Sequence, residues 1–95
     1  MKDVIMISFF KGTKQYGCFL RKENKTKDFI KDFLFVILAD ARKQFTKNAS
    51  WPKVEELTSM VVEDELKPEL NLKQGVFLKM FKEGKDKELV DEILT

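Results

Sequence analysis

Few side chains in this chain have the types and spacing that catalysis needs. The sequence has no His, so Cys18, its one cysteine, has no imidazole to hold a thiolate, and we expect it to pack as a small core side chain. Tyr16, the lysines and the acidic residues could move protons, but no spacing among them marks a catalytic pair. Glycine-rich phosphate loops do not occur in the sequence either. We therefore predict a protein that is not an enzyme, with no catalytic residues and no cofactor.

Basic residues concentrate near the N-terminus, where aromatic residues are interleaved with them. Residues 11–31 hold seven Lys or Arg and two acidic residues. A basic groove lined with aromatic rings binds single-stranded nucleic acid through charge and stacking. The candidate surface for nucleic acid or for an acidic partner consists of Lys11, Lys14, Tyr16, Arg21, Lys22 and Lys25. The alternative is that the aromatic residues face the core while the lysines face solvent.

Acidic residues dominate a later stretch, residues 55–69, which contains six Asp or Glu. Their order lacks the pattern of an EF-hand and the glycine at its turn, so we predict no metal site. A solvated acidic face, or a docking surface for a basic partner, accounts for this stretch better. Trp51, the one Trp, is expected at a helix start, where it is either a packing staple or a binding hot spot. The candidate protein-docking surface consists of Trp51, Glu63, Asp64 and Glu65.

Charge divides the sequence into two halves. Residues 1–53 carry 12 basic and 5 acidic residues, a balance of +7. Residues 54–95 carry 6 basic and 11 acidic residues, a balance of −5, and the net charge of the chain is +2. Such asymmetry favours an electrostatic partner or a second copy bound in the opposite sense. We therefore expect a basic end and an acidic end on the folded surface, through which a homo-oligomer could form.

Length and composition indicate one folded domain over residues 1–95. With 43% hydrophobic residues and nine Phe, the chain can fill one core but not two. Its apolar runs at residues 4–10 and 33–39 are at most seven residues long, far below the roughly 20 that a membrane-spanning helix needs. The lone cysteine fits a reducing compartment. We therefore expect a cytoplasmic protein that does not bind a membrane.

The first half of the sequence predicts a β-hairpin followed by a long helix. Residues 3–10 are rich in β-branched and aromatic types, and residues 15–21 alternate after a polar turn, which indicates a hairpin with a four- or five-residue loop. Thr26 can cap a helix over residues 27–47. Apolar residues nearly surround this helix, so we expect it to be buried on most sides. The alternative is a strand at residues 33–38.

The second half predicts shorter helices. Ser50 would cap the first of them, which fades at residues 63–65. Its buried face is expected to consist of Val54, Leu57, Met60 and Val61. Asn71 and Gln74 resemble a capping box at the start of the next helix, which ends at Gly84. A final short helix follows.

These elements predict an α+β fold: an N-terminal β-hairpin packed on a long hydrophobic helix, followed by two or three shorter helices. The predicted function is a small macromolecular-interaction module, a regulator or inhibitor that binds another protein. The alternative is a nucleic-acid-binding protein that uses the basic-aromatic hairpin. The excess of Lys over Arg, 16 to 2, is typical of an AT-rich genome and would suit an accessory protein of a phage or mobile element.

Overall fold

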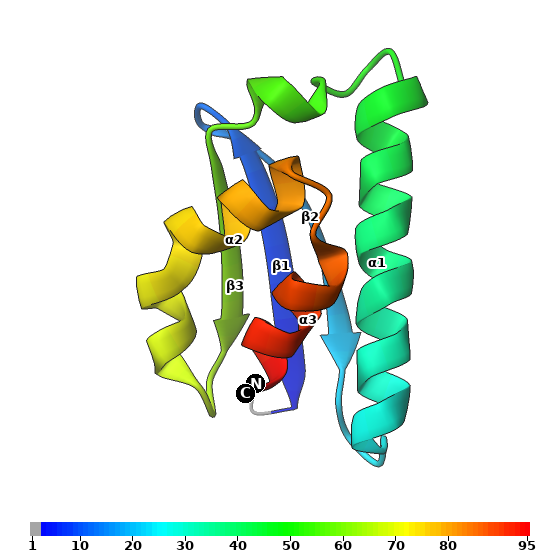
Figure 1. Ribbon diagram of the computed structural model, residues 1–95, viewed down its shortest axis with the longest axis vertical. Coiled ribbons are helices and arrows are strands. Elements are labelled where there is room, and N and C mark those ends of the chain that lie inside the picture. The colour runs from blue at the N-terminus through cyan, green and yellow to red at the C-terminus, as the bar shows by residue number, and fades with distance from the viewer. Residues whose placement is uncertain (1–2) are drawn as a thin grey trace.

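One antiparallel sheet with helices on one of its faces makes up the domain. The computed structural model describes residues 3–95, and it confirms the predicted α+β class. The elements in chain order are β1 (Val4–Lys11), β2 (Lys14–Arg21), α1 (Lys27–Lys47), the 3₁₀ helix η1 (Val54–Glu56), β3 (Ser59–Asp64), the 3₁₀ helix η2 (Pro68–Lys73), α2 (Gln74–Lys82) and α3 (Asp86–Leu94). The strand order is β2-β1-β3, and α1, α2 and α3 lie on the same side of the sheet (Figure 1).

The predicted hairpin is confirmed, but its loop is tighter than expected. Lys11 of β1 pairs directly with Lys14 of β2, so only Gly12 and Thr13 connect the strands. Gly12 has a φ of 61°, and Thr13 does not have a positive φ. A glycine with positive φ at the first of two central positions is typical of a type II′ turn, whose twist matches that of the flanking strands. The loop therefore has two residues instead of the expected four or five.

Helix α1 has the predicted bounds but not the predicted environment. The Thr26 hydroxyl accepts a hydrogen bond from the Phe29 backbone N–H at 3.1 Å, so the expected N-cap is confirmed and the alternative strand at 33–38 is wrong. One face of the helix is buried, namely Ile30, Leu34, Leu38, Ala41 and Phe45. The expectation of burial on most sides is wrong, because the domain packs a single layer against α1 and leaves its other side in solvent.

The helix predicted to start at Ser50 is wrong. The chain forms only the short η1 there, and residues 59–64 form strand β3, which pairs with β1 in the register Ile7 to Val62. Burial alternates along β3, with Met60, Val62 and Asp64 buried. Apolar residues three and four positions apart suggested a helix, but β-branched residues and pairing with β1 favour a strand.

The helical segment after β3 begins earlier than the sequence indicated. Pro68 starts η2, which runs directly into α2, so Asn71 and Gln74 lie within one helical segment and do not cap its start. The predicted stop at Gly84 is confirmed: its φ is 74°, its N–H donates to the Phe81 carbonyl, and the Lys85 N–H donates to the Met80 carbonyl. This pair of bonds is a Schellman motif, which ends α2 and turns the chain into α3.

An aromatic cluster joins the sheet to the helices. Phe9 of β1, Phe45 of α1 and Phe81 of α2 are each no more than 2% exposed. The Phe9 ring lies 5.2 Å from that of Phe45 and 4.6 Å from that of Phe81. Arg42 of α1 reinforces this junction, since its guanidinium lies 4.3 Å from the Phe81 ring centre and pairs with Asp86 at the start of α3. Sheet, α1 and the α2–α3 turn therefore meet in one core.

Two substitutions on α1 test this packing. Leu38 is fully buried and Val36 is 61% exposed. Leu38→Ala is expected to lower the free energy of unfolding by about 2–5 kcal/mol, because it removes buried methyl groups and leaves a cavity. Val36→Ala should change it by no more than about 0.5 kcal/mol. Denaturant unfolding followed by circular dichroism measures both values, and equal losses would contradict the observed orientation of α1.

Candidate functional site

The face of the sheet that no helix covers is the strongest candidate for a binding surface. Residues of each strand point alternately to the two faces, and Ile5, Ile7 and Phe9 of β1 point toward the helices. The opposite face, here called the open face, consists of Val4, Met6, Ser8, Phe10, Gln15, Gly17, Phe19, Arg21, Ser59, Val61 and Glu63. No helix in the described chain, residues 3–95, lies behind the sheet in Figure 1.

The open face mixes apolar side chains with one central polar contact, because the Ser8 hydroxyl accepts a hydrogen bond of 2.8 Å from the Gln15 side-chain amide. Phe19 pairs with Met6 across the strands and is 64% exposed, which is unusual for a ring on a sheet. In the next row Ser8 lies between Gly17 and Val61. A side chain at Gly17 would place its Cβ 3.3 Å from the Ser8 hydroxyl oxygen, so any larger residue at this position would crowd Ser8. The exposed Phe19 ring beside the half-buried Met6 gives a partner an accessible apolar surface.

The charges at the borders of the open face nearly balance. Arg21 lies on the β2 side and forms an ion pair of 3.3 Å with Glu23. Glu63 lies on the β3 side, opposite Met6 of the central strand. The face therefore has Arg21 at one border and Glu63 at the other, and it is not a basic surface.

The six residues predicted to bind nucleic acid are not brought together on one surface. Tyr16 is 8% exposed, and its ring packs 5.8 Å from that of Phe45 and 5.0 Å from that of Trp51. It therefore offers no free face for stacking, as the alternative of core-facing aromatic residues had anticipated. Lys14 lies over the Tyr16 ring on the side of the sheet that faces the helices, whereas Arg21 is on the open face.

The other lysines of this set contact different parts of the chain. Lys11 pairs with Glu56 at 3.1 Å, and Lys22 pairs with Asp64 at 2.7 Å. The Lys25 ammonium lies 5.0 Å from the centre of the Phe29 ring at the start of α1. The basic segment therefore contributes to internal pairs and to separate surfaces, and it does not line a groove.

The candidate docking set of Trp51 and residues 63–65 is also divided. Trp51 is half-buried and packs 5.0 Å from the Phe45 ring, near the end of β1 that holds Phe9. Asp64 pairs with Ile5, four residues away along β1, which corresponds to about 13 Å. Asp64 is buried, so it cannot contact a partner, while Glu63 and Glu65 are exposed.

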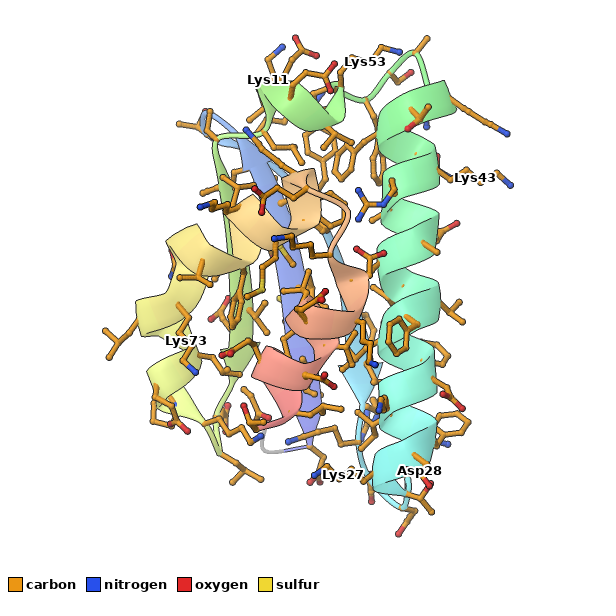
Figure 2. The ribbon with its side chains drawn as sticks, in the orientation of Figure 1. Lys11, Lys27, Asp28, Lys43, Lys53 and Lys73 are labelled. Atoms are coloured by element: carbon orange, nitrogen blue, oxygen red, sulfur yellow. The ribbon has the colours of Figure 1, made fainter. Side chains whose placement is uncertain are left out.

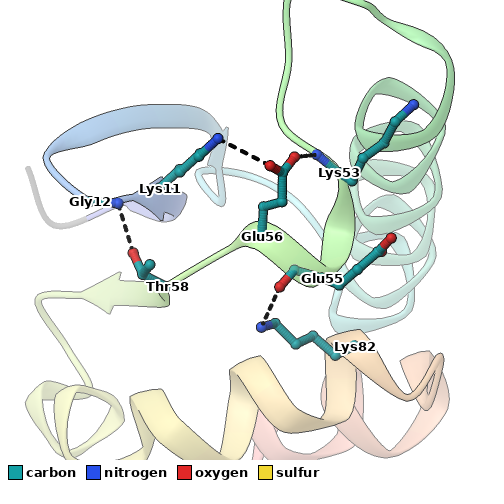
Figure 3. A network of polar contacts seen from close by, with 7 residues as sticks. All are labelled: Lys11, Gly12, Lys53, Glu55, Glu56, Thr58 and Lys82. Carbon is teal, nitrogen blue, oxygen red and sulfur yellow. Dashed lines mark hydrogen bonds and ion pairs between the residues drawn. The ribbon is translucent and has the colours of Figure 1, made fainter.

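A network of polar contacts fixes the hairpin turn to the chain before β3 (Figure 3). One carboxylate oxygen of Glu56 accepts a bond from Lys11 Nζ, and the other accepts a bond of 2.6 Å from the Lys53 backbone N–H. The Lys53 N–H and the Lys11 ammonium lower the pKa of Glu56. The Gly12 N–H donates to the Thr58 hydroxyl at 2.9 Å. These contacts order one end of the sheet.

A small cavity lies between β2 and α1. Its volume is about 110 Å³ and its lining includes Tyr16, Cys18, Ile37, Asp40 and Trp51. Sites for drug-sized ligands are usually about 300–1,000 Å³, so this one is too small for such a ligand. Burial raises the pKa of the Cys18 thiol, and the nearby Asp40 carboxylate raises it further. Within residues 3–95, no three His, Cys, Asp or Glu side chains converge as metal ligands would.

Sequence reasoning did not identify the open face as a site. Alternation along residues 15–21 does place Gly17, Phe19 and Arg21 on the face opposite Tyr16, Cys18 and Leu20. The missing information was which face the helices would cover and that β3 would add Val61 and Glu63. Neither the choice of covered face nor the pairing of β3 can be read from local sequence.

Comparisons with known proteins give no further guidance on the site. The chain matches no protein-family model, and no curated protein and no solved structure is significantly similar to it. None of the helices in the described part of the chain combines the length and the apolar character that a bilayer crossing requires.

Cys18 provides a test of the electrostatics at the cavity. A raised pKa means a smaller thiolate fraction at a given pH, so we expect iodoacetamide to alkylate native Cys18 at pH 8 more slowly than the unfolded chain. Asp40→Asn removes the second cause of the shift and should accelerate the reaction of the native protein. Equal rates for the two native proteins, measured by mass spectrometry, would contradict the contribution of Asp40.

The ion pair of Lys22 with Asp64 is expected to matter more than that of Lys11 with Glu56. The Asp64 side chain is 2% exposed and that of Glu56 is 45% exposed. Lys22→Met leaves a buried carboxylate without its cation, which costs roughly 3–5 kcal/mol of unfolding free energy. Lys11→Met breaks a surface pair worth about 0–1 kcal/mol. Urea unfolding of both variants checks this order, and a larger loss for Lys11→Met would refute it.

Proposed function

We propose that this protein is a small non-enzymatic interaction module that binds another protein through the open face of its sheet. The observation that carries the proposal is the exposure of Phe19, a large aromatic ring that is 64% exposed on that face beside the half-buried Met6. Large apolar side chains usually lie inside, so an exposed ring next to further apolar side chains points to a protein-binding surface. A module of this kind acts as a regulator or inhibitor by occupying the surface that it binds.

The composition of the open face supports a protein partner over nucleic acid. Single-strand binders combine exposed rings with a groove of several cations. Phe10 and Phe19 supply rings on this face, but Arg21 is the one Lys or Arg among its defining residues, and Glu63 opposes it. A face with so little net charge gains little from phosphate contacts. Its exposed aromatic ring, half-buried apolar side chains and mixed border charges instead resemble a protein interface.

The proposal is tested by capture from the cells in which the protein occurs. Immobilised wild-type protein and Phe19→Ser are compared, with Leu72→Ser as the matched control, because Leu72 is 88% exposed on η2 and lies off the open face. We expect wild type and Leu72→Ser to retain the same protein. Phe19→Ser should retain it roughly tenfold less, as for a central aromatic contact. Nuclease treatment should not release it.

Two results would overturn this function. Retention that disappears after nuclease treatment, or that Phe19→Ser leaves unchanged, would remove the open face as a protein-binding surface. A labelled single-stranded oligonucleotide that binds with strong salt dependence, and more weakly to Arg21→Gln, would favour the nucleic-acid alternative. Circular dichroism of each variant shows that the fold is retained.

A further inference from the structure

A second apolar surface lies on α1, away from the sheet. Phe29, Phe33 and Val36 are 44%, 38% and 61% exposed. Their spacing of four and three residues aligns them along one exposed flank of the helix, beside its buried residues. The Phe29 and Phe33 rings stack with centres 5.9 Å apart and planes 23° apart. We call these three residues the outer stripe, and it shares no residue with the open face.

Opposite charges lie at the two ends of the outer stripe. At its start, the Lys25 ammonium lies 5.0 Å from the Phe29 ring centre. At its end, four residues beyond Val36, Asp40 is exposed, and it borders both the outer stripe and the cavity against β2. Lys43 follows Asp40 on α1 and points away from the sheet (Figure 2). Apolar residues are thus bordered by a cation toward the helix start and an anion toward the helix middle.

This pattern is complementary to itself when reversed. The midpoint between Phe29 and Val36 falls between residues 32 and 33. Lys25 precedes α1, but its ammonium lies beside the Phe29 ring, so it borders one end of the stripe as Asp40 borders the other beyond Val36. A two-fold axis at that midpoint would place Phe29 of one copy against Val36 of another, and Lys25 of each against Asp40 of the other. A parallel arrangement would instead oppose like charges at both ends.

We propose that α1 pairs antiparallel with α1 of a second copy of this chain through the outer stripe. Such an interface uses the same patch on both subunits and closes as a two-fold dimer. Three apolar side chains on one helix cover less than the roughly 800 Å² per partner of a standard interface. The dimer is therefore weak, with a dissociation constant on the order of 10–1000 μM, and it depends on protein concentration.

Sedimentation velocity over a concentration series tests the surface. The average mass of the wild-type protein is expected to rise with concentration from that of one chain toward that of two. Phe33→Ser, at the centre of the outer stripe, should weaken association roughly tenfold. Leu72→Ser is the matched control, since it removes a similarly exposed apolar side chain elsewhere and should leave association unchanged. These positions are on the surface, so the variants should fold, which circular dichroism verifies.

Charge exchange tests the antiparallel arrangement. Lys25→Glu and Asp40→Lys should each weaken association roughly threefold or more, because each creates two like-charge contacts. Combining both in one chain restores opposite charges across the axis and should recover most of the wild-type association. Asp32 lies beside the outer stripe next to the axis, so the two Asp32 carboxylates oppose each other, and Asp32→Asn should strengthen the dimer.

Three outcomes would overturn this inference. The first is a wild-type protein that remains a monomer at all concentrations up to about 1 mM, the weak limit of the expected range. The second is association that Phe19→Ser abolishes and Phe33→Ser leaves unchanged, which would make the open face the self-association surface. The third is a charge-exchanged double variant as weak as the single variants. A captured protein that Phe33→Ser releases, with a monomeric wild type, would assign the outer stripe to another partner.

Discussion

The contact of Phe9 with Phe45 and Phe81 is the constraint on which the arrangement of the domain depends. The Phe9 ring joins the central strand to α1 and α2 at one place, and all three rings are fully or almost fully buried. Because β1 carries Phe9 on the same face as Ile5 and Ile7, the helices must gather on that face. The other face of the sheet and the exposed flank of α1 then receive no cover from the described residues. Both candidate surfaces follow from this one-sided core.

Long-range charge pairs explain what happens to the charge division of the sequence. Lys11, Lys22 and Arg42 belong to the basic half, and each pairs with an acidic residue of the other half. Strand β3, from the acidic half, lies beside β1 along most of its length. The halves are therefore interleaved in the sheet and joined by ion pairs, and they do not form the separate basic and acidic ends that we expected. These three ion pairs neutralise part of the excess charge of each half within the fold, so less of it is left to attract an external partner.

Local sequence predicted those elements whose signals are local. A polar turn between alternating runs marks the hairpin, Thr26 marks the start of α1, and Gly84 marks the end of α2. Strand β3 was missed because residues 54–62 fit a helical spacing as well as an alternating one, and pairing with β1 decides between them. The predicted site residues are dispersed in the fold for a related reason. Tyr16 is buried by Phe45 of α1, and Asp64 is paired with Lys22. Each of these partners is distant in sequence and comes close only in the fold.

The separation of the two candidate surfaces has a consequence for how the protein would act. The outer stripe is on α1, in the helical layer, whereas the open face belongs to the other layer (Figure 1). A dimer formed through α1 would therefore leave both copies of the open face available. Two faces held at a fixed spacing bind a partner with repeated or symmetric sites more tightly than one face does, because the second contact becomes intramolecular. A weak dimer and a modest binding face can thus give strong, concentration-dependent association without a large interface on either side.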